Sequence, residues 1–214
     1  MLQKSFELTL LYIIAPIIAF ILVHSYQIPL VMILLPMFFV FALLLFMDRE
    51  FYWKTLFTQG FGWADSVRIF LLFVVSGFAL TALAWYTEGH HFLAFARDRT
   101  NIWLLVMFLY PLISVTTQEL MYRVLFFHRY AGLFGDRAWL AILMNAVFFS
   151  YCHILFLNWH AIIITFIGGL IFAYTYQRTR SFWAVCLEHS LYGCLMFTVG
   201  FGRYFFTGVS NFNF

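Results

Sequence analysis

The main shortage in this sequence is charge. Of 214 residues, 12 are Lys or Arg and 9 are Asp or Glu, which is 10% of the chain, whereas soluble domains contain roughly 25%. Hydrophobic residues make up 64%, and Phe alone occurs 30 times. So little polar surface excludes a soluble globular domain and a disordered chain, and the scattered basic residues form no patch that could bind nucleic acid. The composition predicts an integral membrane protein.

Cysteine is also scarce, and its positions exclude a disulfide framework. The three cysteines, Cys152, Cys186 and Cys194, lie within apolar stretches and form no CxxC pair, which is typical of small buried hydrophobic residues. The apolar run after Lys4 is longer than the core of a signal peptide, so we expect a retained first helix.

Stretches without charged residues define the expected membrane spans. Two of them are 40 residues long, enough for two crossings of about 20 residues each. The seven expected spans lie at 8–47 (two), 69–87, 100 to about 130, 138–177 (two) and about 181–200. We expect Pro111 to kink the fourth span. The sequence therefore predicts an all-α, polytopic membrane bundle of about seven transmembrane helices, in a single domain over residues 1–214.

The basic residues predict the orientation of this bundle, because cytoplasmic loops carry an excess of Lys and Arg. A cytoplasmic N-terminus puts eight basic residues inside: Lys4, Arg49, Lys54, Arg68, Arg129, Arg137, Arg178 and Arg180. Three lie outside: Arg97, Arg99 and Arg203. We therefore expect a multi-pass protein with a cytoplasmic N-terminus, and its short loops fit a bacterial inner (plasma) membrane.

Three charged residues fall inside expected spans. Glu119 and Arg123 lie in the fourth span and Glu188 lies in the seventh; each costs roughly 2.5–3.5 kcal/mol at a helix centre on insertion scales. The i,i+4 spacing places Glu119 and Arg123 on one helix face, where we expect an ion pair. Charges in a membrane span mark functional sites by default, although a pair that only fixes helix packing is the alternative.

Two histidines strengthen the case for a site. His153 and His189 lie in the fifth and seventh spans, and together with Glu119 they are the residue types needed to hold and deprotonate a water molecule. Asn145, Phe149 and His153 are spaced i,i+4,i+8 and form one stripe of a helix. Asn145 could therefore offer its amide to the same cavity, or make a hydrogen bond between helices.

Three segments resemble the motifs of the CPBP intramembrane proteases, a family that includes CAAX prenyl-protein proteases and bacteriocin-processing or Abi-like self-immunity proteins. The segments run from Gln118 to Arg123 (QELMYR), from Phe149 to His153 (FSYCH) and from His189 to Gly193 (HSLYG). The family pattern is Glu-Glu-xxx-Arg, then Phe-xxx-His, then His-xxx-Asn, on successive helices. The resemblance covers about residues 101–200, the motif-bearing core.

The chain departs from the family pattern at two positions. Gln118 stands where the family has the Glu credited with activating water, and a glutamine cannot accept a proton. Gly193 stands where the family has the Asn credited with stabilising the oxyanion. Glu188, directly before His189, is an additional carboxylate. The resemblance therefore implies either a protease rewired around Glu119 or Glu188, or a protein without proteolytic activity.

The leading hypothesis is an intramembrane endopeptidase that acts on a membrane-associated or lipid-modified peptide or protein in the bilayer. A carboxylate, with Glu119 preferred over Glu188, and His153 would activate water. His189 and Asn145 would stabilise the oxyanion, and Arg123 would orient Glu119.

Three alternatives stay open. No cofactor is expected, but Glu119, His153 and His189 could form a two-His, one-carboxylate zinc set; the absence of an HExxH pair counts against it. A non-catalytic membrane scaffold or binding protein is favoured by Gln118. A transporter would use the same polar residues along a path, although the chain lacks the paired repeats typical of transporters.

Overall fold

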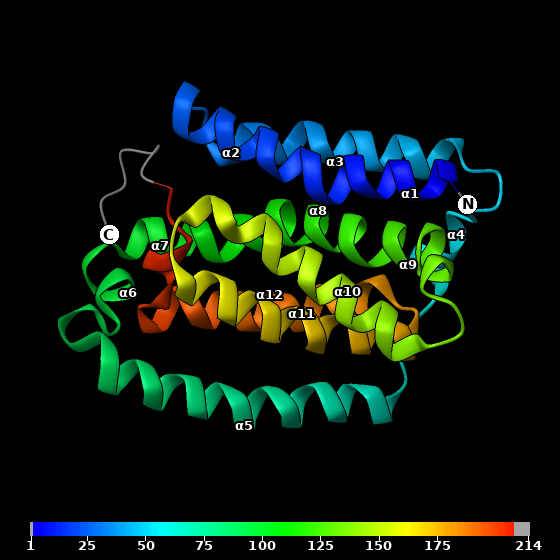
Figure 1. Cartoon of the computed structure of the whole chain (residues 1–214). Helices are drawn as coiled ribbons and strands as arrows, with labels where there is room; N and C mark the ends of the chain where they lie inside the picture. Colours follow the sequence, from blue (N-terminus) through cyan, green and yellow to red (C-terminus); the bar gives the residue numbers. More distant parts are fainter. Residues whose placement is uncertain (1, 208–214) are drawn as a thin grey trace.

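The chain folds into a bundle of long helices. A computed structural model describes residues 2–207, and within that range the regular structure is helical throughout. Seven helical stretches are long and apolar enough to cross a membrane, which confirms the predicted all-α polytopic fold (Figure 1). These spans are Leu2–Tyr26, Leu30–Met47, Trp63–His91, Thr100–Phe134, Ala138–Phe156, Trp159–Thr179 and Phe182–Val199.

Several spans change helical type along their length. The elements in chain order are α1 (Leu2–Thr9), η1 (Leu10–Ile14), α2 (Ala15–Tyr26), α3 (Leu30–Met47), α4 (Lys54–Thr58), α5 (Trp63–Glu88), η2 (Gly89–His91), α6 (Ala94–Asp98), α7 (Thr100–Leu109), η3 (Tyr110–Val115), α8 (Thr116–Glu119), η4 (Leu120–Leu125), α9 (Phe126–Arg129), η5 (Ala131–Phe134), α10 (Ala138–Tyr151), η6 (Cys152–Phe156), α11 (Trp159–Thr179), α12 (Phe182–Val199) and η7 (Phe201–Phe205). The segments η1, η3 and η4 are π-helical, and the other η segments are 3₁₀ turns. Two of the three π-helical segments lie in the fourth span and flank α8.

The third span begins earlier than the charge pattern predicts, at Trp63 instead of residue 69. Two charged residues in its first turns have partners on the neighbouring span: Arg178 donates to Asp65 at 2.7 Å, and Arg68 donates to Thr175 at 2.9 Å. These contacts satisfy the charges at the start of α5, so the helix extends past the limit set by hydropathy.

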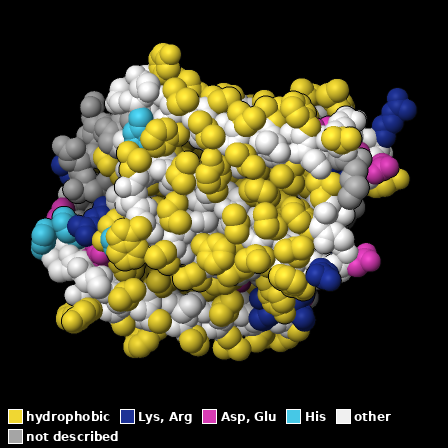
Figure 2. All heavy atoms as spheres, viewed as in Figure 1, with side chains coloured by type: hydrophobic (Ala, Val, Ile, Leu, Met, Phe, Trp, Pro, Cys, Tyr) yellow, Lys and Arg dark blue, Asp and Glu magenta, His cyan; other side chains and the backbone are white. Residues whose placement is uncertain are grey.

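The surface of the bundle matches a lipid environment. The face shown in Figure 2 is covered by hydrophobic side chains, and the charged side chains visible there gather at its two ends. Large apolar side chains such as Phe39 and Phe78 are 67% and 78% exposed, which would be costly in water and is favourable in lipid.

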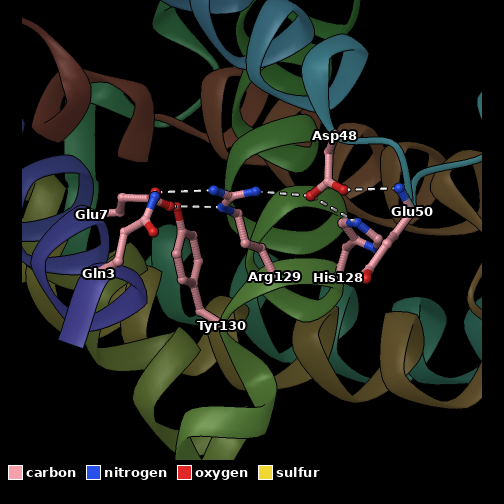
Figure 3. Close-up of polar contacts among 7 residues, drawn as sticks. All are labelled: Gln3, Glu7, Asp48, Glu50, His128, Arg129 and Tyr130. Carbon is pink, nitrogen blue, oxygen red and sulfur yellow. Dashed lines mark hydrogen bonds and ion pairs between the residues drawn. The ribbon is translucent and has the colours of Figure 1, made fainter. Parts of the chain in front are cut away.

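A network of charged side chains ties the first, second and fourth spans together at one end of the bundle (Figure 3). Arg129 donates to Glu7 at 2.7 Å and to Asp48 at 2.8 Å, and Asp48 also lies 3.3 Å from His128. Burial would raise the pKa of Asp48, but hydrogen bonds from the Glu50 backbone N–H and from Arg129 hold the pKa below its usual value. This end is the one that the charge count places in the cytoplasm.

Candidate active site

A cavity of about 460 Å³ lies between the helices of the motif-bearing core and α5. Leu83 of α5 and Ile167 of α11 both line it and remain 51% and 53% exposed, so the cavity wall reaches the lateral surface between these two helices. Phe205 of η7 lines the cavity and packs edge-on against Phe156, with ring centroids 5.5 Å apart. Most of the lining is apolar, and the few polar side chains include His153 and His189.

The predicted ion pair in the fourth span is present. The Nε of Arg123 lies 3.3 Å from Oε2 of Glu119, and both side chains are fully buried. The guanidinium carbon lies 4.7 Å from the ring centroid of Phe149 and 5.7 Å from that of Phe172. Arg123 is therefore held by a carboxylate and two aromatic rings, an arrangement that lets a guanidinium stay charged without water.

The second oxygen of Glu119 contacts His189 on α12. Oε1 of Glu119 lies 2.7 Å from Nδ1 of His189, and Nε2 of His189 lies 3.0 Å from the hydroxyl oxygen of Tyr110. Because a carboxylate only accepts hydrogen bonds, Nδ1 of His189 is the donor in this contact. The His189 ring also stacks on Phe172 at 4.6 Å, so its orientation is fixed from two sides.

His153 lines the same cavity from η6, the 3₁₀ turn that ends the fifth span. Its Nδ1 lies 2.6 Å from the carbonyl oxygen of Phe149. A carbonyl only accepts hydrogen bonds, so Nδ1 carries the proton and Nε2 keeps its lone pair. The Phe149 ring lies between the two histidines, at 4.9 Å from His153 and 5.7 Å from His189. Two imidazoles from separate helices therefore meet at one cavity, as the sequence predicts.

Gln118 lines the cavity one residue before Glu119. Its amide nitrogen donates to the hydroxyl of Ser114 at 2.7 Å. Its Oε1 is buried and has no hydrogen-bond partner within residues 2–207. Gln118 and His153 also line a neighbouring small cavity, so the free carbonyl of Gln118 and the imidazole of His153 share two cavity walls.

Glu119 and Arg123 stand behind the cavity and do not line it. Glu119 has no exposed surface, and its two oxygens face His189 and Arg123. The expectation that Glu119 deprotonates water directly therefore lacks the required access, since a base must reach the proton it removes. Its position is that of a group that orients His189.

Asn145 also lies outside the cavity wall. Its side-chain nitrogen donates to the backbone carbonyl of Tyr122, and the Tyr12 hydroxyl donates to the neighbouring carbonyl of Met121 at 2.7 Å. Both carbonyls belong to the π-helical η4, where the i→i+5 pattern disturbs the regular backbone ladder. The structure thus gives Asn145 the second of its two expected roles, a hydrogen bond between helices, and not a place beside His189.

Glu188 is fully buried but turned away from the cavity. Its polar neighbours are Thr175 of α11 and Arg68 of α5. One residue of an α-helix corresponds to about 100° of rotation, so the carboxylate points to a different face of α12 from His189. This position does not fit a base that acts in the cavity.

The zinc set of Glu119, His153 and His189 is not assembled as a ligand group. Within residues 2–207, no three His, Cys, Asp or Glu side chains are grouped so that they could hold a metal ion. The polar contact of His189 that sequence reasoning missed is Tyr110, which lies eight residues before Gln118. The position of Tyr110 directly before Pro111 indicates only a local irregularity of the helix and not a contact with His189.

The comparisons with known proteins agree with the motif-based resemblance. Residues 99–195 match the family model described as Type II CAAX prenyl endopeptidase Rce1-like. The matched range covers slightly less than half of the chain and contains all three motifs, which confirms the predicted resemblance to the CPBP proteases. No curated protein and no solved structure matches the chain.

Proposed function

We propose that this protein is an intramembrane endopeptidase that hydrolyses a peptide bond in a membrane-associated or lipid-modified substrate. The observation that carries the proposal is the meeting of His153 and His189 at one largely apolar cavity. Each ring is held in one orientation by a hydrogen bond at Nδ1, to Phe149 and to Glu119 respectively. Orienting an imidazole through one nitrogen leaves the other for chemistry.

In this proposal His153 is the general base. Its Nε2 has a free lone pair, and the buried Oε1 of Gln118 on the same wall can accept a hydrogen bond from the attacking water and hold it there. The base is then an imidazole, and the amide at position 118 only positions the water. Glu119 is a positioning residue that acts through His189, and Arg123 balances its charge.

The cavity walls favour a substrate with an apolar segment. Leu80, Ile164 and Ile171 line the cavity on α5 and α11, beside the point where it reaches the lateral surface. A hydrocarbon chain or an apolar peptide segment could enter there directly from the bilayer without crossing a polar surface. The description of the matched family, a prenyl endopeptidase, is consistent with a lipid-modified substrate.

A second candidate function, a non-catalytic membrane scaffold, is favoured by one observation. Within residues 2–207 the cavity lining contains no Asp or Glu, so a carboxylate that deprotonates water is lacking there. If His153 does not act as a base, the same cavity would only bind an apolar segment.

Cleavage by the purified wild-type protein tests the proposal. We expect hydrolysis of an internally quenched peptide that ends in a farnesylated cysteine followed by three residues. We expect the unprenylated peptide to be cleaved more slowly, because it loses the apolar contact with the cavity. A chelator should leave the rate unchanged, since water activation is assigned to imidazole. Failure to cleave both the prenylated peptide and a membrane-inserted helical peptide would overturn the proposal in favour of the scaffold.

A further inference from the structure

Tyr110 occupies a defined place at the polar end of the cavity. It is the first residue of the π-helical η3, and its hydroxyl oxygen lies 3.0 Å from Nε2 of His189. Its ring packs edge-on against Phe197 with centroids 5.2 Å apart. The phenol is therefore anchored by its ring, its hydroxyl lies beside the imidazole, and both Tyr110 and His189 line the cavity.

The position of Tyr110 depends on the glycine at 193. A Cβ atom built on Gly193 would overlap the Tyr110 ring and its hydroxyl. Glycine weakens a helix because of its backbone freedom, so its place within α12 needs a packing reason, and the Tyr110 ring provides one. The two positions are coupled: the ring of Tyr110 fills the room that any side chain at 193 would need.

The hydrogen bonds of His189 leave Tyr110 as the donor at this end of the cavity. In the neutral form of His189, the proton on Nδ1 is directed at Glu119, and the unprotonated Nε2 can only accept. The hydroxyl of Tyr110 is then the group that donates, and it has one proton to give. Asn145, the other amide expected here, is committed to the carbonyl of Tyr122.

We propose that Tyr110 donates the hydrogen bond that stabilises the oxyanion of the proposed proteolytic reaction, in the space left by the missing side chain at Gly193. The inference rests on the proposed function and adds a catalytic residue to it. Rotation about the phenol C–O bond directs the proton from Nε2 of His189 to the substrate oxygen, and the ring need not move.

The step balances with Tyr110 keeping its proton. The water oxygen bonds to the peptide carbonyl carbon, the water proton passes to Nε2 of His153, and the carbonyl π electrons move to the oxygen that accepts from Tyr110. When the C=O bond re-forms, the C–N bond breaks and the leaving nitrogen takes the proton from His153. Preorganised donors of this kind act mainly on the transition state.

Replacing Tyr110 with Phe removes the donor and keeps the ring that packs beside Gly193. On the prenylated peptide we expect kcat to fall about 100-fold or more, the usual effect of losing one oxyanion donor, with KM and the thermal melting temperature in detergent little changed. The matched control is Tyr130→Phe. The Tyr130 hydroxyl donates to Glu7 at 3.3 Å in the charged network of Figure 3, and Tyr130 does not line the cavity, so we expect nearly wild-type kcat.

A paired substitution separates the donor role from a packing role. Tyr110→Ala empties the space, and Tyr110→Ala with Gly193→Asn returns an amide N–H to it. We expect kcat of the double variant to exceed that of Tyr110→Ala by about tenfold or more, which is part of the rate enhancement that one oxyanion donor provides. If wild type cleaves and Tyr110→Phe keeps its kcat, the role of Tyr110 is wrong while the proposed function stands. If wild type cleaves no probe, both are wrong.

Discussion

Cleavage is expected to fall by roughly 10²–10⁴-fold when His153 is replaced by Asn, the usual contribution of a general base. An Asn side-chain nitrogen can take the place of Nδ1 and keep the hydrogen bond to the carbonyl of Phe149. It cannot supply the basic nitrogen that faces the cavity. The loss should therefore appear in the initial rate of peptide cleavage while the melting temperature in detergent stays close to that of wild type.

A histidine at the other end of the bundle provides the control. His128 lies 3.3 Å from Asp48 in the charged network of Figure 3 and does not line the cavity. His128→Asn should keep the wild-type rate within a few-fold. A His153→Asn protein that is folded and cleaves as fast as wild type would rule out His153 as the base.

The largest expected loss of stability comes from replacing Arg123 with Met. Arg123 and Glu119 are both fully buried at 3.3 Å, and removing one partner of a buried pair leaves the other charge uncompensated, at a cost of roughly 3–5 kcal/mol. Met preserves much of the apolar contact with Phe149 and Phe172. The free energy of unfolding, measured by denaturant titration in mixed micelles, should fall by this amount.

The double variant Glu119→Gln with Arg123→Met distinguishes a charge effect from a packing effect. Removing both charges should recover part of the stability that Arg123→Met loses, because no uncompensated carboxylate remains. Its cleavage should stay low, since an uncharged amide at position 119 favours the proton on Nδ1 of His189 less strongly than the carboxylate of Glu119 does. Equal stability of wild type and Arg123→Met would contradict the view that the pair matters for folding.

The fold was predictable because lipid imposes a simple rule on sequence. Runs without charge had to be spans. The run 138–177, predicted to hold two spans, is divided at Asn158, whose side chain caps α11 by accepting from the N–H of Ala161. The early start of α5 was not predictable, since it depends on the contact between Asp65 and Arg178, 113 residues apart in the chain. Hydropathy carries no information about such partners.

The residue types of the candidate site were predictable from the sequence, but the directions in which their side chains point were less so. The spacing of Glu119 and Arg123 predicts their pair on any regular helix, and it is present. The stripe predicted through Asn145 and His153 is interrupted, because α10 ends at Tyr151 and His153 lies in the 3₁₀ turn η6. The Asn145 amide instead donates to the carbonyl of Tyr122 in the π-helical η4. Helix-wheel reasoning assumes a regular ladder and cannot find such a carbonyl.

Tyr110 is a residue of the site that the sequence analysis did not identify. Its hydroxyl reaches His189, 79 residues later in the chain, and its ring needs the empty space at Gly193. The sequence signal was Gly193 itself, because a glycine inside a helix indicates that another part of the chain packs closely against the backbone. Only the packing of the fourth span against α12 identifies the tyrosine.

The central claim is that an imidazole replaces the missing carboxylate as the base, and the ratio of the cleavage rates of Gln118→Glu and wild type tests it most directly. Gln118 lines the cavity, and its buried Oε1 has no hydrogen-bond partner within residues 2–207, so a glutamate there would occupy the place of the family base. We expect measurable cleavage by wild type and a ratio at or below one, because a second buried negative charge beside Glu119 costs energy without supplying a needed base. A silent wild type together with an active, folded Gln118→Glu variant would contradict the account and identify the natural chain as a protease fold that has lost its base.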